Sequence, residues 1–338
     1  MLSVELQALR SVIQELHFQI YRAVRESLRA SSVTNPRGAK AGAGDVSYAI
    51  DVIAEDIIVE FFSQRNIGNG VIVVSEGIGR RVFPEGLVED RADYVLIIDP
   101  IDGTREIMYN KRSAWILTGV ARNSGNGVTL ADIEFAIQTE IPTLKQDRAS
   151  VVYASVGQGS FEEVWDIDNG RLLTEPTRLS SSSADNLRHG YIMFVNPYTS
   201  TRSKNAAIVD QLIEQAVGPA QDNEVLVFTD QYGSTAGQVY MLATAKYRLV
   251  ADLRPAIALH QRAAGIGGGL CCHPYDLCTY LVAVEAGSAI TDLAGGSLRY
   301  PLDTTTDCGW VGYANPLLRE AVEPVLLDAI AQQLNQSK

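Results

Sequence analysis

Two acids, Asp99 and Asp102, follow an apolar run in a segment whose proline and glycine favour a turn. Residues 94–98 read Tyr-Val-Leu-Ile-Ile, which is typical of a buried strand, and residues 99–104 continue as Asp-Pro-Ile-Asp-Gly-Thr. Proline fixes φ at position 100, and glycine at position 103 permits a turn that a bulkier residue would resist. We therefore expect Asp99 and Asp102 to point into one cleft beside the Thr104 hydroxyl, where their oxygens suit a hard divalent cation.

Further acids occupy similar positions, at strand ends and helix starts. Residues 71–74 read Val-Ile-Val-Val and predict a short buried strand that ends at Glu76, and Asp276 stands near the start of an expected helix. If these two acids converge with Asp99 and Asp102, their mutual repulsion makes the empty site unfavourable. About two or three Mg²⁺ ions would neutralise such a site, bind a phosphate dianion and clamp the attacking and leaving oxygens.

Single acids in this set also admit a structural explanation. Asp276 is typical of a first helical turn, where the helix dipole favours a negative charge. Asp45 fits the N-cap of a helix expected from about Asp45 to Ser63, and Asp51 fits a solvated face of the same helix. A single acid does not distinguish the two explanations, and only the whole set of acids in this order along the chain favours a metal-binding or catalytic site over a structural role.

Charge and cysteine content limit the classes of partner and compartment. The chain has 338 residues and a formal net charge of −12, so it is a poor general binder of nucleic acid polymers or anionic membranes. No stretch approaches the roughly 20 apolar residues of a membrane span. Glu5 stands where a signal peptide would be basic, and four cysteines are too few for a disulfide scaffold. We therefore expect a cytoplasmic protein with a small-molecule partner.

Hydrophobic periodicity predicts an α/β chain in two halves. The first half, residues 1–180, contains the 99–104 motif and is expected to be α+β. The second half, residues 181–338, is expected to be α/β, to complete the metal site and to form the substrate pocket. Helices are expected over 3–30 and 45–63, strands near 94–98, 115–121, 132–138 and 150–155, a polar loop over 32–44, and irregular structure over 156–186.

Taken in order, these segments resemble the signature of the inositol monophosphatase superfamily, which includes fructose-1,6-bisphosphatases and 3′-phosphoadenosine-5′-phosphate phosphatases. The resemblance spans residues from about 40 to about 320, and its specificity lies in the ordered set. The similar segments are Lys40, residues 45–51 (Asp-Val-Ser-Tyr-Ala-Ile-Asp), 74–76 (Val-Ser-Glu), 99–104, 275–287 and 314–316 (Ala-Asn-Pro).

The resemblance implies a layered α-β-α-β-α sandwich and a Mg²⁺-dependent, lithium-sensitive phosphatase that forms a homodimer. It implies that two or three metal ions are held by Glu76, Asp99, the Ile101 carbonyl, Asp102 and Asp276. It also implies direct attack by a metal-activated water, with no phosphoenzyme. Asp51 and Thr104 would pair to orient and deprotonate that water, with Glu76 as a third catalytic residue.

Substrate contacts follow from the same resemblance. Backbone N–H groups of Gly103 and Thr104, at a helix N-terminus, would hold phosphate oxygens. Lys40 lies on the loop where the superfamily also has a lysine, and we expect it to contact the substrate. Asp252 stands where the superfamily often has an acid that touches substrate hydroxyls.

The sequence departs from the superfamily pattern in three places. Gly77 replaces the second acid after Ser-Glu, which puts an outer metal ion or its waters in question, and Tyr275 replaces a tryptophan. Residues 253–274 form an insertion that suits a lid, a specificity loop or a subunit contact. Cys271, Cys272 and Cys278 do not have the paired spacing of zinc ligands.

These observations predict Mg²⁺-dependent hydrolysis of a small phosphorylated polyol or sugar, in the manner of an inositol monophosphatase. Arg105-Glu106 directly after the motif favours the alternatives, a 3′(2′),5′-bisphosphate nucleotide phosphatase or a fructose-1,6-bisphosphatase. A further alternative is a catalytically weak member that binds metal or ligand as a regulator, which Gly77 and the altered substrate region permit.

Overall fold

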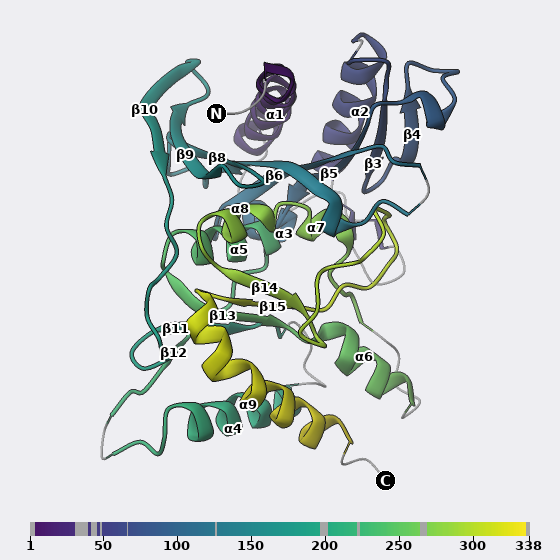
Figure 1. Cartoon of the computed structure of the whole chain (residues 1–338). Helices are drawn as coiled ribbons and strands as arrows, with labels where there is room; N and C mark the ends of the chain where they lie inside the picture. The colour runs from purple at the N-terminus through teal and green to yellow at the C-terminus, as the bar shows by residue number, and fades with distance from the viewer. Residues whose placement is uncertain are drawn as a thin grey trace.

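The two larger sheets of the described chain are stacked with a layer of helices between them and a layer on each outer face (Figure 1). The computed structural model describes residues 4–30, 40–41, 46–47, 49–65, 67–125, 127–196, 202–221, 224–263 and 269–335. Five layers in the order α-β-α-β-α confirm the expected α/β sandwich. None of the helices in these ranges is long and apolar enough to cross a membrane.

The larger sheet has eight strands in the order β10-β9-β8-β7-β6-β5-β3-β4. All neighbouring pairs are antiparallel except β3 and β5, which run parallel. Because their carboxyl ends meet at one edge, the residues that follow both strands lie close together. The strands are β3 (Val71–Ser75), β4 (Gly79–Phe83), β5 (Tyr94–Asp102), β6 (Ala114–Arg122), β7 (Ile133–Ile141), β8 (Ala149–Ser155), β9 (Gly159–Asp166) and β10 (Arg171–Arg178).

Helices α1 (Val4–Ala30) and α2 (Ala49–Ser63) cover the outer face of this sheet (Figure 1). Each buries one apolar face, which includes Leu16 and Ile20 on α1 and Ile58 on α2. His17 lies in the same interface, where its two ring nitrogens are each 2.9 Å from a hydroxyl oxygen, of Thr139 and Thr118. A two-stranded sheet, β1 (Lys40–Ala41) and β2 (Val46–Ser47), precedes α2.

The middle layer contains α5 (Thr235–Ala243), α7 (Pro274–Leu277) and α8 (Leu281–Glu285). This layer packs tightly on the larger sheet at Gly119 of β6, where an added Cβ would lie 2.6 Å from the Cys278 carbonyl oxygen. A continuous apolar core runs through the layer and reaches Trp115 on one sheet and Trp310 on the other. Helix α7, which carries Asp276 in its first turn, is therefore fixed between two sheets.

The smaller sheet has five strands in the order β12-β11-β13-β15-β14, and its far side is covered by helices (Figure 1). Asn315 begins the last helix by accepting a hydrogen bond from the Leu318 N–H at 2.9 Å, with proline at the first helical position. The elements are β11 (Tyr191–Phe194), β12 (Phe228–Thr229), β13 (Tyr247–Asp252), β14 (Ala289–Asp292), β15 (Trp310–Tyr313), α4 (Arg202–Ala216), α6 (Arg254–Ala263) and α9 (Pro316–Asn335).

Two local predictions were wrong. Residues 156–186 are not irregular, because they contain β9 and β10, which extend the larger sheet to its edge. β10 is mostly exposed, so its polar composition hides the strand. The helix expected from Asp45 begins at Ala49, and part of the preceding segment forms β2; Asp45 and most of the expected loop over 32–44 lie outside the described residues.

All strands of the larger sheet lie within residues 1–180, and all strands of the smaller one lie within 181–338. The division into two domains stays a prediction. Short elements complete the described chain: α3 (Thr104–Met108) and the 3₁₀ turns η1 (Glu89–Arg91) and η2 (Leu130–Asp132).

Candidate active site

The end of β5 holds two buried carboxylates. Asp99 is 1% exposed and Asp102 is 6% exposed. The pairing of β5 with β6 shifts register between these two residues, so both can face the same side. Asp99 accepts a hydrogen bond from the Ile101 N–H at 2.9 Å, which fixes the turn. Gly103 then adopts φ +92°, where an added Cβ would also lie 2.9 Å from the Ser234 side chain.

The start of helix α5 positions the second of these acids. Asp102 accepts hydrogen bonds from the backbone N–H of Ala236 at 2.6 Å, from the Thr235 N–H at 3.2 Å and from the Ser234 hydroxyl at 2.8 Å. Ser234 is the N-cap of α5, and its side chain also accepts from the Gly237 N–H at 3.0 Å. The start of α5 thus satisfies the hydrogen-bonding capacity of Asp102 and holds this acid against the middle helical layer.

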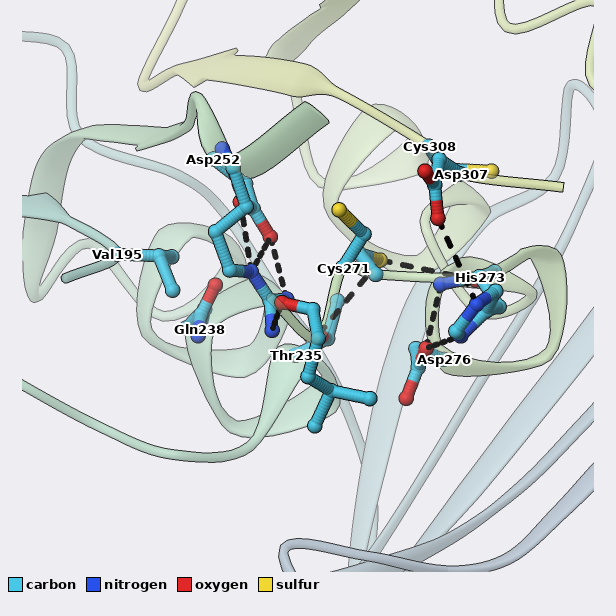
Figure 2. Close-up of polar contacts among 12 residues, drawn as sticks. Val195, Thr235, Gln238, Asp252, Cys271, His273, Asp276, Asp307 and Cys308 are labelled. Atoms are coloured by element: carbon cyan, nitrogen blue, oxygen red, sulfur yellow. Dashed lines mark hydrogen bonds and ion pairs between the residues drawn. The ribbon is translucent and has the colours of Figure 1, made fainter. Parts of the chain in front are cut away.

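Helix α7 brings a third acid to the same place. Asp276 accepts a hydrogen bond from the His273 N–H at 2.6 Å, in the first turn of the helix (Figure 2). Asp99, Asp102 and Asp276 each offer a carboxylate oxygen, and these atoms lie within 4.8 Å of one another. Within the described ranges, this is the only group of three or more potential metal ligands, and no cysteine belongs to it.

Burial makes the charged forms of these acids costly. Burial, and then the charges of Glu76 and Asp102, raise the pKa of Asp99 well above its usual range. Burial and the charge of Asp102 likewise raise the pKa of Asp276. Burial raises the pKa of Asp102 to about 6, although its hydrogen bonds from Ala236 and Ser234 act in the opposite direction. An oxygen-only donor set with this excess of negative charge fits a hard divalent cation such as Mg²⁺.

Glu76 follows β3 at the same sheet edge, as the parallel pairing of β3 with β5 requires. The Tyr275 hydroxyl donates a hydrogen bond to Glu76 Oε1 at 3.3 Å. The Tyr275 ring stacks on His273, with ring centroids 5.4 Å apart. His273 in turn lies 3.8 Å from Asp276 and 3.7 Å from Asp307 (Figure 2). The tyrosine in place of the superfamily's tryptophan therefore adds a polar contact to a predicted metal ligand.

Thr104 and Asp51 form the second feature of the site. The Thr104 hydroxyl lies 3.1 Å from Asp51 Oδ1 and 2.8 Å from the Ile101 carbonyl oxygen, so it can donate to either. The contact joins the start of α3 to α2, and both helices contribute to one apolar core cluster. A threonine hydroxyl held by a carboxylate can accept a proton from water and pass its own proton to the acid.

A sequence profile described as the inositol monophosphatase family matches residues 5–337. The chain belongs to the inositol monophosphatase family. A search of curated proteins found no match. The resemblance on which the sequence analysis relied is therefore confirmed, and membership supports phosphatase activity on small phosphorylated substrates.

Solved structures agree with this family at the level of the fold. The extragenic suppressor protein SuhB from Bartonella henselae is 16% identical, with a TM-score of 0.64 over 94% of this chain and 98% of that chain. A fructose-1,6-bisphosphatase from Leishmania major is 15% identical, with a TM-score of 0.65 over 98% and 99%. An inositol monophosphatase (IMPase) from Thermotoga maritima is 18% identical, with a TM-score of 0.59 over 95% and 98%.

This family member has an ion pair where the pattern predicted a substrate-binding acid. Asp252, at the end of β13, has a fully buried side chain. Its carboxylate accepts hydrogen bonds from Arg254 Nε at 2.9 Å and from Arg254 Nη2 at 2.6 Å. Arg254 is the first residue of α6, which occupies the first part of the 253–274 insertion. The inserted segment thus begins by neutralising Asp252.

The remaining predicted residues are placed as follows. Lys40 begins β1, and its side chain lies outside what the structure describes. The four cysteines are free and buried. Ser234 and Arg254 were not foreseen: the N-cap signal of Ser234 is visible in the sequence before the α5 pattern, but its partner Asp102 is 132 positions away.

Proposed function

We propose that this chain hydrolyses a phosphate monoester of a small polyol or sugar, in the presence of Mg²⁺, by direct attack of water. One observation supports it most: the Thr104–Asp51 hydrogen bond lies beside three acids whose oxygens come within 4.8 Å of one another. Two acids on their own would be equally consistent with a structural role and would not indicate catalysis. A hydroxyl–carboxylate pair next to a candidate cation site suits the activation of water.

Different residues of the chain would bind the metal ions and activate the water. Asp99, Asp102, Asp276, Glu76 and the Ile101 carbonyl would hold about two or three Mg²⁺ ions. When bound, Mg²⁺ would supply charge neutralisation for the phosphate and would lower the pKa of a water molecule. Among the groups of the chain, Thr104 would accept a hydrogen bond from the attacking water.

The proton and the bonds balance without a covalent intermediate. The Thr104 hydroxyl would take the proton from water as it donates its own to Asp51. The new bond forms between the water oxygen and phosphorus, and the bond between phosphorus and the alcohol oxygen breaks. The alcohol oxygen leaves with a proton from solvent, and inorganic phosphate is the second product. The backbone N–H groups of Gly103 and Thr104 would hold phosphate oxygens in this step.

The leaving alcohol would lie toward Asp252, and Lys40 would be a further substrate contact. Figure 2 shows Asp252 and Thr235 on one side of the view, with His273 and Asp276 on the other. Because the Asp252 side chain is fully buried in its ion pair with Arg254, a substrate hydroxyl would have to replace or share the hydrogen bonds that Arg254 donates. Lithium sensitivity, a homodimer and a cytoplasmic location are part of the same proposal, by membership of the family.

A second candidate is a bisphosphate as substrate, either of a sugar or of a nucleotide. Arg105 is exposed directly after Thr104, where a cation would suit a second phosphate group. Its neighbour Glu106 is buried and accepts a hydrogen bond from the Gly233 N–H at 3.1 Å, so only Arg105 supports this candidate. A protein of the same fold, from Leishmania major, is named a fructose-1,6-bisphosphatase.

The test is phosphate release with and without Mg²⁺. The panel contains inositol 1-phosphate, fructose 1,6-bisphosphate, histidinol phosphate and 3′-phosphoadenosine 5′-phosphate, with Asp99→Asn as the control. Mg²⁺-dependent release that disappears in the variant supports the proposal, and the best substrate decides between the two candidates. Binding of Mg²⁺ with no release on any substrate would instead support a regulatory, catalytically weak member.

A further inference from the structure

In the ion pair of Asp252 and Arg254, the arginine is the member that reaches solvent. The Asp252 side chain is 0% exposed and the Arg254 side chain is 12% exposed. Asp252 stands at the end of β13, where the superfamily pattern places an acid that touches substrate hydroxyls. A molecule that enters from solvent at this position therefore meets the guanidinium before it meets the carboxylate.

The hydrogen bonds of Arg254 hold one edge of its guanidinium. Nε and Nη2 donate to the Asp252 carboxylate, at 2.9 Å and 2.6 Å. Nη1 makes one long contact, 3.5 Å from the Leu270 carbonyl oxygen. A guanidinium has more N–H groups than these bonds within the described part of the chain use, so its Nη1 edge can donate to a ligand.

The same guanidinium lies close to the acids of the candidate metal site. Figure 2 shows the contacts of Asp252 with Arg254 on the Thr235 side of the carboxylate, and the Thr235 N–H donates to Asp102 at 3.2 Å. Burial raises the pKa of Asp102 and of Asp276, and the charge of Arg254 acts on both in the opposite direction. A substrate whose phosphate is held at these acids would therefore lie beside Arg254.

The inserted segment over 253–274 fixes this arginine in place. Arg254 is the first residue of α6, near the start of the segment, and its contact with Leu270 lies near the end of the segment. Ile257 and Ala258 of α6 are buried and anchor the helix. A guanidinium that is already held on one edge loses little further freedom when it binds a ligand, so the arrangement is preorganised.

We propose that Arg254 is a specificity-determining residue that binds a second anionic group, a carboxylate or a phosphate, on the alcohol part of the substrate. This inference rests on the proposed function, because the first phosphate must be held at the neighbouring acids. An acid at this position accepts hydrogen bonds from hydroxyls, whereas the guanidinium donates them, and its planar fork matches carboxylate and phosphate oxygens. The chain then prefers a bisphosphate or a phosphate ester of a hydroxy acid to a phosphate ester of a neutral polyol.

The test compares substrates that differ by one anionic group, with kcat/KM measured in the presence of Mg²⁺. Fructose 1,6-bisphosphate is compared with fructose 1-phosphate, and 2-phosphoglycerate with glycerol 2-phosphate, so that the first pair tests a phosphate and the second a carboxylate. We expect the wild type to favour the more anionic member of one pair by about 10-fold or more, the size of a hydrogen bond to a charged group. Equal values within both pairs would overturn the inference.

The decisive variant is the double substitution Asp252→Asn with Arg254→Gln, which removes the guanidinium without leaving a buried carboxylate unpaired. We expect the ratio of kcat/KM within the favoured pair to fall by about 10-fold. Arg254→Lys keeps the charge and the ion pair but lacks the fork, so it should lose part of the ratio in a chain that folds normally. Arg262→Gln, an exposed arginine on α6, is the matched control and should keep the ratio. Loss of the ratio in Arg105→Gln, with the double variant unchanged, would overturn the inference.

Product binding separates this inference from the proposed function. Titration calorimetry with fructose 6-phosphate and with glycerate, the alcohols that these reactions would release, requires no turnover. A protein that releases no phosphate, but binds one of these products more weakly in the double variant, would contradict the proposed reaction and support Arg254 as the anion-binding residue. A protein that hydrolyses both members of each pair equally well, in the wild type and the double variant alike, would support the proposed reaction and overturn only the role of Arg254.

Discussion

The Thr104 hydroxyl lies 3.1 Å from Asp51 Oδ1, across a separation of 53 positions in the sequence. The contact is possible because Gly103 turns the chain immediately after β5, so that Thr104 starts a new helix at the sheet edge where α2 passes. It brings a proton acceptor to a hydroxyl that stands next to Asp102. This pair can be altered without changing the acids that would hold metal, so binding and turnover can be tested separately.

Removing either member of the pair should reduce turnover far more than metal binding. We expect Asp51→Asn and Thr104→Ala each to lower kcat by about 10²–10⁴-fold, the usual size of a general-base contribution. Mg²⁺ affinity should change little, while Thr104→Ser should keep most of the activity because it keeps the hydroxyl. Steady-state kinetics and calorimetric titration of the same preparations check this. If Thr104→Ala were as active as the wild type, proton transfer through this pair would have to be abandoned.

Replacing one buried acid should stabilise the metal-free protein and reduce the stabilisation that added metal provides. Asp276→Asn removes a charge that Asp102 and Glu76 oppose, and the asparagine oxygen can still accept from the His273 N–H. We expect the free energy of unfolding in EDTA to rise by about 1 kcal/mol or more near pH 8. The increase in Tm on adding Mg²⁺ should shrink.

Thermal unfolding with EDTA and with Mg²⁺ measures both effects. Asp328→Asn, on the exposed face of α9, is a control for the loss of one negative charge. A lower Tm in EDTA for Asp276→Asn would indicate that the hydrogen bonds of Asp276, and not its repulsion, dominate in the metal-free state.

Features that lie close in sequence could be predicted, and features that depend on distant partners could not. The apolar run before Asp99 and the glycine at position 103 are local signals: the strand formed where expected but continues to Asp102, and the turn follows at Gly103. The binding of Asp102 by the start of α5 depends on Ser234, which nothing near Asp102 indicates. Likewise, the absence of an acid at position 77 is visible in the sequence, but the approach of Glu55 to that position is not.

The strand at the edge of the larger sheet was another feature that the sequence analysis predicted wrongly. A strand whose residues are exposed on both faces needs no apolar alternation, so β10 has the composition of a loop. The helix in the insertion was hidden for a different reason. Arg254 and the residues after it were interpreted as a loop because the superfamily pattern has no counterpart there, although α6 buries Ile257 and Ala258 on one face.

Acidification should destabilise the protein through His17. Burial between the larger sheet and α1 lowers the pKa of His17 from 6.5 to about 3. The unfolded chain therefore takes up a proton below about pH 6.5 while the folded chain does not, and stability is lost as the pH falls through that value. The expected loss is about 1.4 kcal/mol per pH unit, or about 2 kcal/mol by pH 5.

Urea unfolding from about pH 7.5 to pH 5 measures this contribution as a difference between the wild type and His17→Gln, which cancels the effect of the carboxylates. The variant should be less stable near pH 7.5, because the glutamine fits the two threonine hydroxyls less well. Its stability should fall less steeply with acid. Parallel curves would mean that His17 is protonated to the same extent in both states.

The effects of replacing Asp252 and Arg254 on the free energy of unfolding should be strongly non-additive. Arg254→Gln leaves the Asp252 carboxylate buried without its partner, and such a change typically costs about 3–5 kcal/mol of unfolding free energy. Asp252→Asn in the same chain removes the unpaired charge, so the double variant should be more stable than Arg254→Gln alone. Arg262→Gln, on the exposed part of α6, is the control for the loss of a cation from this helix. Urea unfolding of the wild type, Arg254→Gln, Asp252→Asn alone and the double variant completes a double-mutant cycle. Additive losses would show that Asp252 is solvated in solution, and would leave its carboxylate available to substrate hydroxyls without competition from Arg254.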